Sequence, residues 1–222
     1  MTPDRSVPAK VKICGLSTPD TMAAALAAGA DFVGLVFHRP SPRHVDFETA
    51  SRLAEQARGR ARSVAVVVDA PPGDIARIAT EVRPDYIQAH GSETPEMIRD
   101  ISTRTGIPVI KAIAIGGPDD FGRARFFQDA ATMMLFDTKT PPTLADGLPG
   151  GNGLAFDWEL CRRAGISGEF VLSGGLDPAN VGRAIALTGA SIVDVSSGVE
   201  RSRGVKDEEL IRNFIEAVRR AG

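Results

Sequence analysis

The sequence predicts a single closed (β/α)8 barrel that spans residues 1–222. Strand-like and helix-like segments alternate eight times along the chain, and no linker or shift in composition interrupts them. This alternation favours parallel strands joined by right-handed crossovers, and 222 residues is a usual length for one such barrel. A doubly wound open sheet is the alternative, but no Gly-x-Gly-x-x-Gly motif follows the first strand.

The first half of the chain supplies four strand–helix units. Its strands are apolar or β-branched runs of the kind found in covered parallel sheets, and Thr, Asp and Pro residues mark the helix starts. The predicted strands are residues 10–16 with a turn at Gly15, 30–37, 63–69 and 85–90. The predicted helices are residues 22–28 after capping residues at 17–20, then 46–58, 72–80 and 94–106.

The second half repeats this pattern and leaves no element over. The predicted strands are residues 108–115, 132–137, 170–173 and 191–197. The predicted helices are residues 118–127, 156–164, 178–188 and 207–220. A loop rich in Pro and Gly, residues 138–153, follows the sixth strand. Eight units with nothing left over indicate the TIM-barrel architecture.

Composition narrows the class of function. With 43% hydrophobic and 24% charged residues the chain is an ordinary globular protein, and a net charge of −2 provides no attraction to nucleic acid or an anionic membrane. No apolar run is long enough to span a membrane, and the N-terminus has no signal-peptide pattern. Two distant cysteines, Cys14 and Cys161, form neither a disulfide framework nor a zinc site. We therefore expect a cytoplasmic protein without metal or cofactor, either a monomer or a homodimer.

The first strand carries a cysteine and a lysine on one face. Side chains alternate along a strand, so Lys12 and Cys14 point to one side while Val11 and Ile13 point to the other. A neighbouring ammonium favours the thiolate, which is the reactive form of cysteine. Taken alone, this stretch favours an unreactive cysteine, because free cysteines are among the most buried residues. The other strand ends decide between the two interpretations.

Polar residues gather at the carboxyl ends of the predicted strands, where the active sites of such barrels lie. Gln88 and His90 share one face of the fourth strand. Asp137 ends an apolar strand, where burial favours the protonated form that a general acid needs. Arg43, in the loop after the second strand, has a planar fork suited to a substrate carboxylate. The alternatives are a capping aspartate, a solvated arginine and a histidine that only satisfies a hydrogen bond.

Two glycine-containing segments predict a phosphate site. Ser173–Gly175 ends the seventh strand and Ser196–Gly198 ends the eighth. Glycines let the backbone approach a ligand closely, and exposed N–H groups there can face an anion. The loops after these two strands are the recurring phosphate site of this architecture. Two ordinary tight turns are the alternative, but their occurrence together favours phosphate.

Taken together, these residues resemble the phosphoribosylanthranilate isomerase family. The resembling segments run in order from the first strand to the eighth: Lys12–Leu16, Phe37 with Ser41–Arg43, Gln88–Gly91, Phe136–Thr138, Gly150–Gly153 with Phe156–Trp158, Gly174–Leu176 and Asp194–Glu200. The combination is specific, although no single segment is. There are two small departures, since Ala89 stands where the family usually has leucine and Ser173 where alanine is common.

The resemblance implies an Amadori rearrangement in tryptophan biosynthesis. A small phosphosugar, N-(5'-phosphoribosyl)anthranilate, would become 1-(2-carboxyphenylamino)-1-deoxyribulose 5-phosphate. By similarity, Asp137 protonates the ring oxygen and opens the sugar to a Schiff base, and Cys14 then removes the C2 proton. Each step is a proton transfer beside a polarised C=N bond, so the resemblance implies neither metal nor redox cofactor.

The same resemblance implies how the substrate is held. Arg43 would bind the anthranilate carboxylate, and we expect Lys12, Gln88 and His90 to be further substrate-binding residues. The phosphate would be held by Gly174, Gly175, Ser196, Ser197 and Gly198. Residues 141–153 would close over the substrate and exclude water. Whether Lys12 tunes Cys14 or braces the barrel interior stays open at this point.

Two rival functions are weighed against this one. The related aminoaldose isomerase of histidine biosynthesis resembles an aspartate pair on the first and fifth strands, but here the first strand carries Cys14 and the fifth has no carboxylate. A non-catalytic phosphosugar-binding barrel would keep the glycine segments and could lose the acid or the base. The presence of both Cys14 and Asp137 argues against it.

Overall fold

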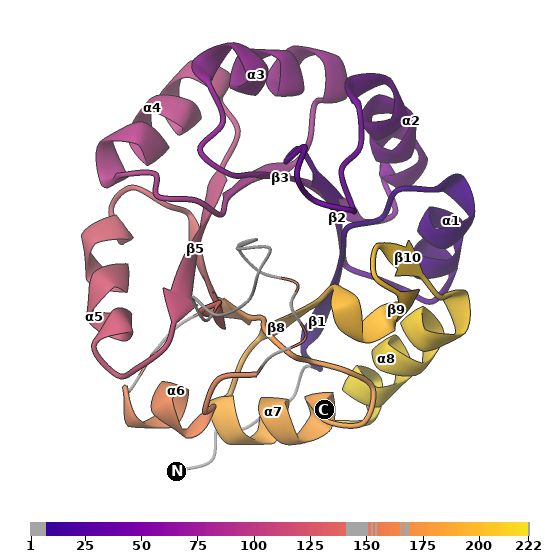
Figure 1. Cartoon of the computed structure of the whole chain (residues 1–222), viewed down its shortest axis with the longest axis vertical. Coiled ribbons are helices and arrows are strands. Elements are labelled where there is room, and N and C mark those ends of the chain that lie inside the picture. The colour runs from indigo at the N-terminus through magenta and orange to yellow at the C-terminus, as the bar shows by residue number, and fades with distance from the viewer. Residues whose placement is uncertain are drawn as a thin grey trace.

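The computed structural model describes residues 8–140, 151, 153, 155–164, 166 and 169–221. Within these residues eight parallel strands close into a barrel, in which each strand pairs with the next and β8 pairs with β1 (Figure 1). The strands are β1 (Lys10–Cys14), β2 (Phe32–Val36), β3 (Arg62–Val67), β4 (Tyr86–Ala89), β5 (Val109–Ile115), β6 (Met133–Thr138), β7 (Phe170–Leu172) and β8 (Ile192–Val195). The predicted (β/α)8 barrel is confirmed, while the assignment of all 222 residues to one domain stays a prediction.

The helices form an outer ring around the strands (Figure 1). They are α1 (Pro19–Ala27), α2 (Phe47–Ala57), α3 (Pro72–Arg77), α4 (Pro95–Thr105), α5 (Asp120–Ala124), α6 (Glu159–Arg163), α7 (Val181–Thr188) and α8 (Glu208–Arg220). A π-helical turn (Ile78–Val82) extends α3, and a 3-10 turn (Arg125–Phe127) extends α5. None of the helices in the described part of the chain is long and apolar enough to cross a membrane.

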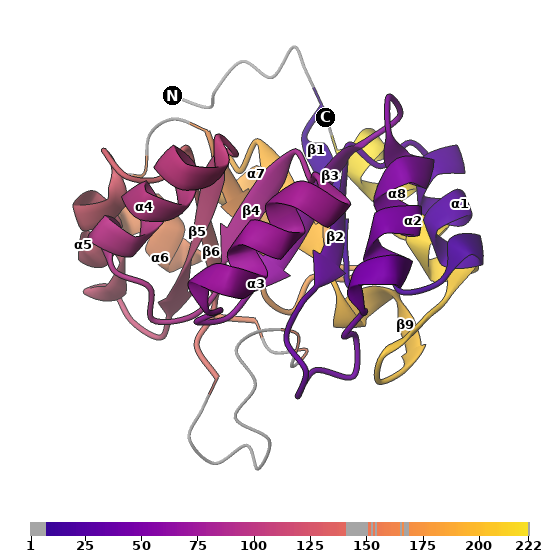
Figure 2. The same ribbon diagram turned by 90° about the horizontal axis from the view of Figure 1, so that it is seen from above.

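The expectation that no element is left over was wrong. After β8 the chain makes a 3-10 turn (Ser197–Val199) and then an antiparallel hairpin of β9 (Glu200–Ser202) and β10 (Val205–Lys206). The predicted strand 191–197 ends early because Ser196 leaves extended geometry, with ψ at −80°. Gly204 makes the hairpin turn at φ +82°, packed against the loop after β2. Figure 2 shows β9 beyond one end of the strands.

Side chains of the barrel strands divide into an inner and an outer core, as strand alternation predicts. Val11 and Ile13 belong to the outer core, which packs against the helices. Cys14 belongs to the inner core, with Val36, Val66 and other residues that fill the barrel. This division confirms that Cys14 faces the barrel interior, and it places the chemistry-bearing side chains at one end of that interior.

Candidate active site

A cavity at the carboxyl ends of the strands holds most of the predicted site residues. It has a volume of about 60 Å³ and is lined by Cys14, Val36, His38, Ser41, Arg43, Val66, Val68, Gln88, His90, Asp137, Gly151, Ser173, Asp194 and Ser196. The predicted acid, base and carboxylate-binding arginine therefore share one cavity. A larger groove of about 540 Å³ lies outside the barrel between α3 and α4, but none of its lining residues is a cysteine or histidine.

Cys14 lies at the end of β1 with its side chain turned inward, and the residue is only 8% exposed. Burial raises the pKa of its thiol, because the thiolate loses its hydration. The ammonium groups of Lys12 and Lys206 pull the pKa in the opposite direction, while the carboxylate of Asp194 raises it further. Lys12 thus acts in the direction expected from sequence, but burial outweighs it and the pKa of the thiol is raised overall.

Lys12 lies deeper in the barrel and does not line the cavity. Its Nζ donates to Asp194 Oδ1 at 2.7 Å, and the side chain is 1% exposed. Burial alone would lower the pKa of Lys12, but the charge of Asp194 raises it overall. Ser173 Oγ donates to the other carboxylate oxygen of Asp194 at 3.1 Å. Lys12 thus braces the interior through Asp194, and its charge opposes the effect of burial on the pKa of Cys14.

Asp137, His90 and Gln88 form a hydrogen-bonded chain. Gln88 Nε2 lies 2.9 Å from His90 Nδ1, and His90 Nε2 lies 3.2 Å from Asp137 Oδ2. An amide nitrogen can only donate, so Nδ1 accepts and the ring proton lies on Nε2, facing Asp137. The backbone N–H of Thr138 donates to Asp137 Oδ1 at 2.8 Å. Both oxygens of this carboxyl group are therefore held by donors.

The loop that carries His90 is fixed by two carboxylates from outside the cavity. Asp69, at φ +47°, accepts a hydrogen bond from the backbone N–H of Ser92 at 2.7 Å, so this strand-end aspartate supports a loop. Glu93 accepts from the N–H of Gly91 at 2.9 Å, and Lys111 donates to Glu93 at 2.7 Å. Both partners of this last pair are almost fully buried. The loop is therefore held rigidly beside the acid.

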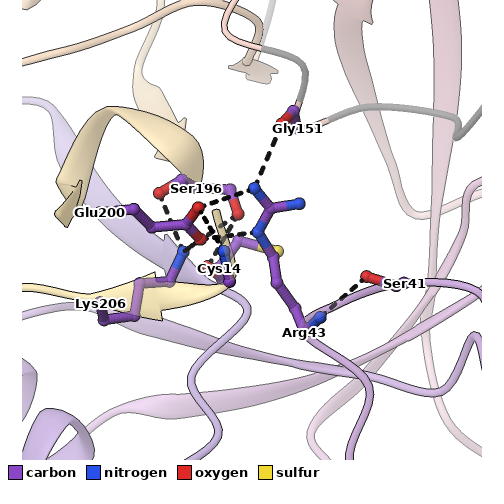
Figure 3. Close-up of polar contacts among 8 residues, drawn as sticks. Cys14, Ser41, Arg43, Gly151, Ser196, Glu200 and Lys206 are labelled. Atoms are coloured by element: carbon purple, nitrogen blue, oxygen red, sulfur yellow. Dashed lines mark hydrogen bonds and ion pairs between the residues drawn. The ribbon is translucent and has the colours of Figure 1, made fainter. Parts of the chain in front are cut away.

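Arg43 is buried at the rim of the cavity (Figure 3). Its guanidinium makes a two-pronged ion pair with Glu200, from Nε to Oε1 at 2.7 Å and from Nη2 to Oε2 at 2.9 Å. Nη2 also donates to the carbonyl oxygen of Gly151 at 3.2 Å. A Cβ on Gly15 would lie 2.6 Å from Arg43 Cδ, and one on Gly151 would lie 2.6 Å from Nη1. Two glycines and a carboxylate thus determine where the guanidinium lies.

Glu200 and Lys206 were missed as functional candidates by sequence reasoning. Lys206 Nζ donates to Glu200 Oε1 at 2.7 Å and to the carbonyl oxygen of Ser196 at 2.8 Å. Burial raises the pKa of Glu200, but the bonds from Arg43 and Lys206 outweigh it and lower that pKa to about 2. Burial lowers the pKa of Lys206 to about 8 in spite of Glu200. The only sequence signal was the position of Glu200 at the end of the last resembling segment.

The predicted phosphate segments lie side by side after β7 and β8. Gly174 and Gly175 both have positive φ, at +92° and +62°. A Cβ on Gly198 would collide with the carbonyl oxygen of Leu176, so the two loops approach too closely for a side chain there. Ser196 does not face outward, because its Oγ donates to the carbonyl oxygen of Cys14 at 3.1 Å.

The described residues contain no cluster of three or more His, Cys, Asp or Glu side chains that could hold a metal ion. Cys161, the second cysteine, is buried in α6, and burial raises its pKa to about 12. It lies outside the cavity and has the character of a packing residue.

Comparison with known proteins gives one consistent family. Residues 11–217 match the family described as "PRAI: N-(5'phosphoribosyl)anthranilate (PRA) isomerase". An N-(5'-phosphoribosyl)anthranilate isomerase from Parvibaculum lavamentivorans is 45% identical over 212 residues, which cover 96% of this chain and 99% of the relative.

Solved structures agree with this result. A phosphoribosyl anthranilate isomerase in complex with reduced 1-(o-carboxyphenylamino)-1-deoxyribulose 5-phosphate has a TM-score of 0.82 and 34% identity, covering 95% of this chain and 98% of its own. A monomeric form of the dimeric Thermotoga maritima enzyme has a TM-score of 0.81 and 34% identity, with the same coverage.

Proposed function

The chain belongs to the N-(5'-phosphoribosyl)anthranilate isomerase family, and we propose how its own residues carry out the reaction. That reaction is an Amadori rearrangement in tryptophan biosynthesis, which converts the aminoaldose N-(5'-phosphoribosyl)anthranilate into the aminoketose 1-(2-carboxyphenylamino)-1-deoxyribulose 5-phosphate. The observation that carries the proposal is that Cys14, Asp137 and Arg43 line one cavity. A base, an acid and a carboxylate-binding group are the three functions that this substrate requires.

Asp137 is the proposed general acid. Its carboxyl group gives a proton to the furanose ring oxygen, the C1–O bond breaks, and the nitrogen lone pair forms the C=N bond of a Schiff base. The carboxylate left behind keeps two donors, the Nε2–H of His90 and the backbone N–H of Thr138. These bonds stabilise the charge that develops on Asp137 as the ring opens. His90 thus supports the acid, which is a more specific role than the substrate binding expected from sequence.

Cys14 is the proposed general base. Its thiolate removes the C2 proton next to the polarised C=N bond, and the electron pair moves to nitrogen to give an enolamine. Tautomerisation of the enolamine, with a proton returned to C1, gives the ketone. Because burial raises the pKa of the thiol, the thiolate is a strong base once it forms. The positive charges of Lys12 and Lys206 assist its formation.

Arg43 is the residue proposed to bind the anthranilate carboxylate. Nη2 already contacts a carbonyl oxygen, that of Gly151, and a substrate carboxylate would take its place on the same edge of the guanidinium. The phosphate would be bound by backbone N–H groups of Gly174, Gly175, Ser197 and Gly198, where two loops meet without intervening side chains. The engagement of the Ser196 hydroxyl with Cys14 supports a role in positioning the base instead of direct phosphate contact.

Three expectations keep the status of predictions. Closure of residues 141–153 over the substrate lies outside the described residues, apart from Gly151 and Gly153. A homodimer is supported by the dimeric relative from Thermotoga maritima, and a monomer is the alternative. The cytoplasmic location expected from the sequence also stays a proposal.

The test is turnover of phosphoribosylanthranilate by the purified full-length protein, followed by the loss of anthranilate-type fluorescence. We expect turnover without added metal or cofactor. Binding of inorganic phosphate without turnover would contradict the acid–base assignment and favour the phosphosugar-binding barrel. Turnover of the histidine-pathway aminoaldose alone would favour the rival isomerase, although β5 carries no carboxylate in this chain.

A further inference from the structure

Three buried charged residues form a cluster between the rim of the cavity and the hairpin β9–β10 (Figure 3). Glu200 lies between Arg43 and Lys206 and bonds to both, each at 2.7 Å in its shortest contact. The three side chains are 3%, 6% and 1% exposed, in that order. Surface ion pairs contribute little, but a buried cluster such as this one holds its members in fixed positions.

The charges of this cluster do not balance, because one carboxylate faces two cations. The other buried pairs in the described part of the barrel, Lys12–Asp194 and Lys111–Glu93, each match one cation with one carboxylate. A buried excess of positive charge is costly unless an anion lies nearby. The reaction supplies two anions at this place, the Cys14 thiolate and the substrate carboxylate.

We propose that Glu200 and Lys206 are positioning residues of the isomerase, Glu200 for Arg43 and Lys206 for the loop and charge of Cys14. This inference rests on the proposed function, but its first test measures the reactivity of Cys14 and does not need turnover of substrate. Neither residue lines the cavity, so each acts through a neighbour and not on the substrate itself.

Glu200 fixes the orientation of the guanidinium. It occupies the Nε–Nη2 edge of Arg43 with both carboxylate oxygens. The Nη1–Nη2 edge, where only the carbonyl oxygen of Gly151 accepts from Nη2, is the edge that a ligand would take. It is itself held by Lys206 and by the backbone N–H of Gly204 at 3.0 Å. The hairpin turn at Gly204 therefore sets the position of Arg43 through Glu200.

Lys206 connects the hairpin to the base. All of its donors have partners, which are Glu200 Oε1 and the carbonyl and hydroxyl oxygens of Ser196. Ser196 Oγ in turn donates to the carbonyl oxygen of Cys14. The charged groups that act on Cys14 are Lys12 and Asp194, which form a closed pair, and Lys206. Lys206 has no carboxylate to itself, since Glu200 is shared with Arg43, and it carries its charge below its pKa of about 8.

The first experiment measures the rate of alkylation of Cys14 by iodoacetamide at pH 7, where Lys206 is charged, in protein carrying Cys161→Ala. Addition of Lys206→Met should lower this rate about tenfold, the usual effect of losing a nearby opposite charge, and should change it much less above pH 8. Lys206→Gln, which keeps a donor without the charge, should lower it similarly and serves if the methionine variant does not fold. Lys111→Met removes another buried paired lysine and should leave the rate at pH 7 in place. An unchanged rate at pH 7 in folded Lys206 variants overturns the proposal, whether or not the protein turns over substrate.

The second experiment tests Glu200 with two ligands. The first ligand is reduced 1-(o-carboxyphenylamino)-1-deoxyribulose 5-phosphate, called the reduced product analogue below. In Glu200→Gln its binding should weaken about tenfold or more, because the charge-assisted contact of its carboxylate with Arg43 loses its geometry. The same compound without its aromatic carboxyl group should bind wild type and variant within about twofold of one another. Equal weakening of both ligands would assign Glu200 a merely structural role and overturn its part of the proposal.

Discussion

Gly34 on β2 faces Cys14 so closely that a Cβ at this position would lie 2.8 Å from the sulfur. It would also lie 3.1 Å from Cys14 Cα, so a side-chain shift alone would not relieve the contact. The two strands are in register here, with Cys14 paired to Gly34. The absence of a side chain on β2 therefore makes room for the base on β1.

Gly34→Ala should displace the thiol and lower kcat by about tenfold or more, because small misplacements of reacting groups are costly. Overpacking of the inner core should lower the free energy of unfolding by about 1–3 kcal/mol. Steady-state kinetics and urea unfolding measure the two effects. Gly182→Ala is the matched control, since a Cβ there makes only an ordinary contact, 3.6 Å from Ala221 Cβ in the last turn of the chain. Wild-type kcat in Gly34→Ala would show that the sulfur position is not critical.

Cys14→Ser and Asp137→Asn should each lower kcat by about 100-fold or more while the reduced product analogue still binds, since each variant removes a proton-transferring group. Turnover and calorimetric binding to the same preparations measure both quantities. In the wild type, the alkylation rate of Cys14 should still be rising above pH 9, because burial raises the thiol pKa from its ordinary value of 9.0. Substantial activity in Cys14→Ser would refute the assignment of the base.

His90→Phe should lower kcat by about tenfold, less than Asp137→Asn, because it removes only the donor that steadies the acid. KM should change little, since the ring is engaged by Gln88 and Asp137 on its two nitrogens. The measurement is a comparison of kcat and KM for the variant with those for wild type. A rise in KM with unchanged kcat would instead support the direct substrate contact expected from sequence.

The alternation of strand-like and helix-like segments predicted the barrel. The period of two within a strand predicted the inward direction of Cys14 and Gln88, because it leaves each strand residue only two faces. It also indicated that Lys12 shares the face of Cys14. The closed pair of Lys12 with Asp194 could not be predicted, because partners 182 residues apart meet only through barrel closure. In sequence a buried cation is no different from a surface one.

The hairpin β9–β10 could not be predicted from local sequence either. Residues 200–206 contain four charged side chains, which in a local interpretation indicates a solvated turn. In the structure the side chains of two of them, Glu200 and Lys206, are buried and paired with each other, and Glu200 also pairs with Arg43. The other two, Arg201 in β9 and Arg203 in the turn, are exposed. Helices α5 and α6 are also shorter than predicted. Phe156 and Trp158 pack against the outer core before α6 begins at Glu159.

Arg43→Ala should weaken the binding of substrate by about tenfold or more, while the binding of inorganic phosphate should change little. The physical reason is that the guanidinium lies at the rim of the cavity, whereas the two glycine segments follow β7 and β8. Competition of each ligand with the reduced product analogue measures the two affinities. Equal weakening would contradict the assignment of Arg43 to the carboxylate.

Glu200→Gln should change the acid stability of the protein. The pKa of Glu200 is lowered from 4.5 to about 2, so its carboxylate stabilises the fold above about pH 4.5 and this contribution is lost as pH falls toward 2. The contribution is on the order of 3 kcal/mol in the unfolding free energy, because each pKa unit corresponds to about 1.4 kcal/mol. In urea titrations the unfolding free energy of the wild type should therefore exceed that of the variant most at neutral pH, and the difference should shrink between pH 4.5 and about 2.

Glu55→Gln, at an exposed ion pair with Arg58, is the control and should leave the pH dependence of stability nearly unchanged. A wild-type advantage that stays constant down to pH 2 would mean that the ionisation of Glu200 does not hold the cluster together.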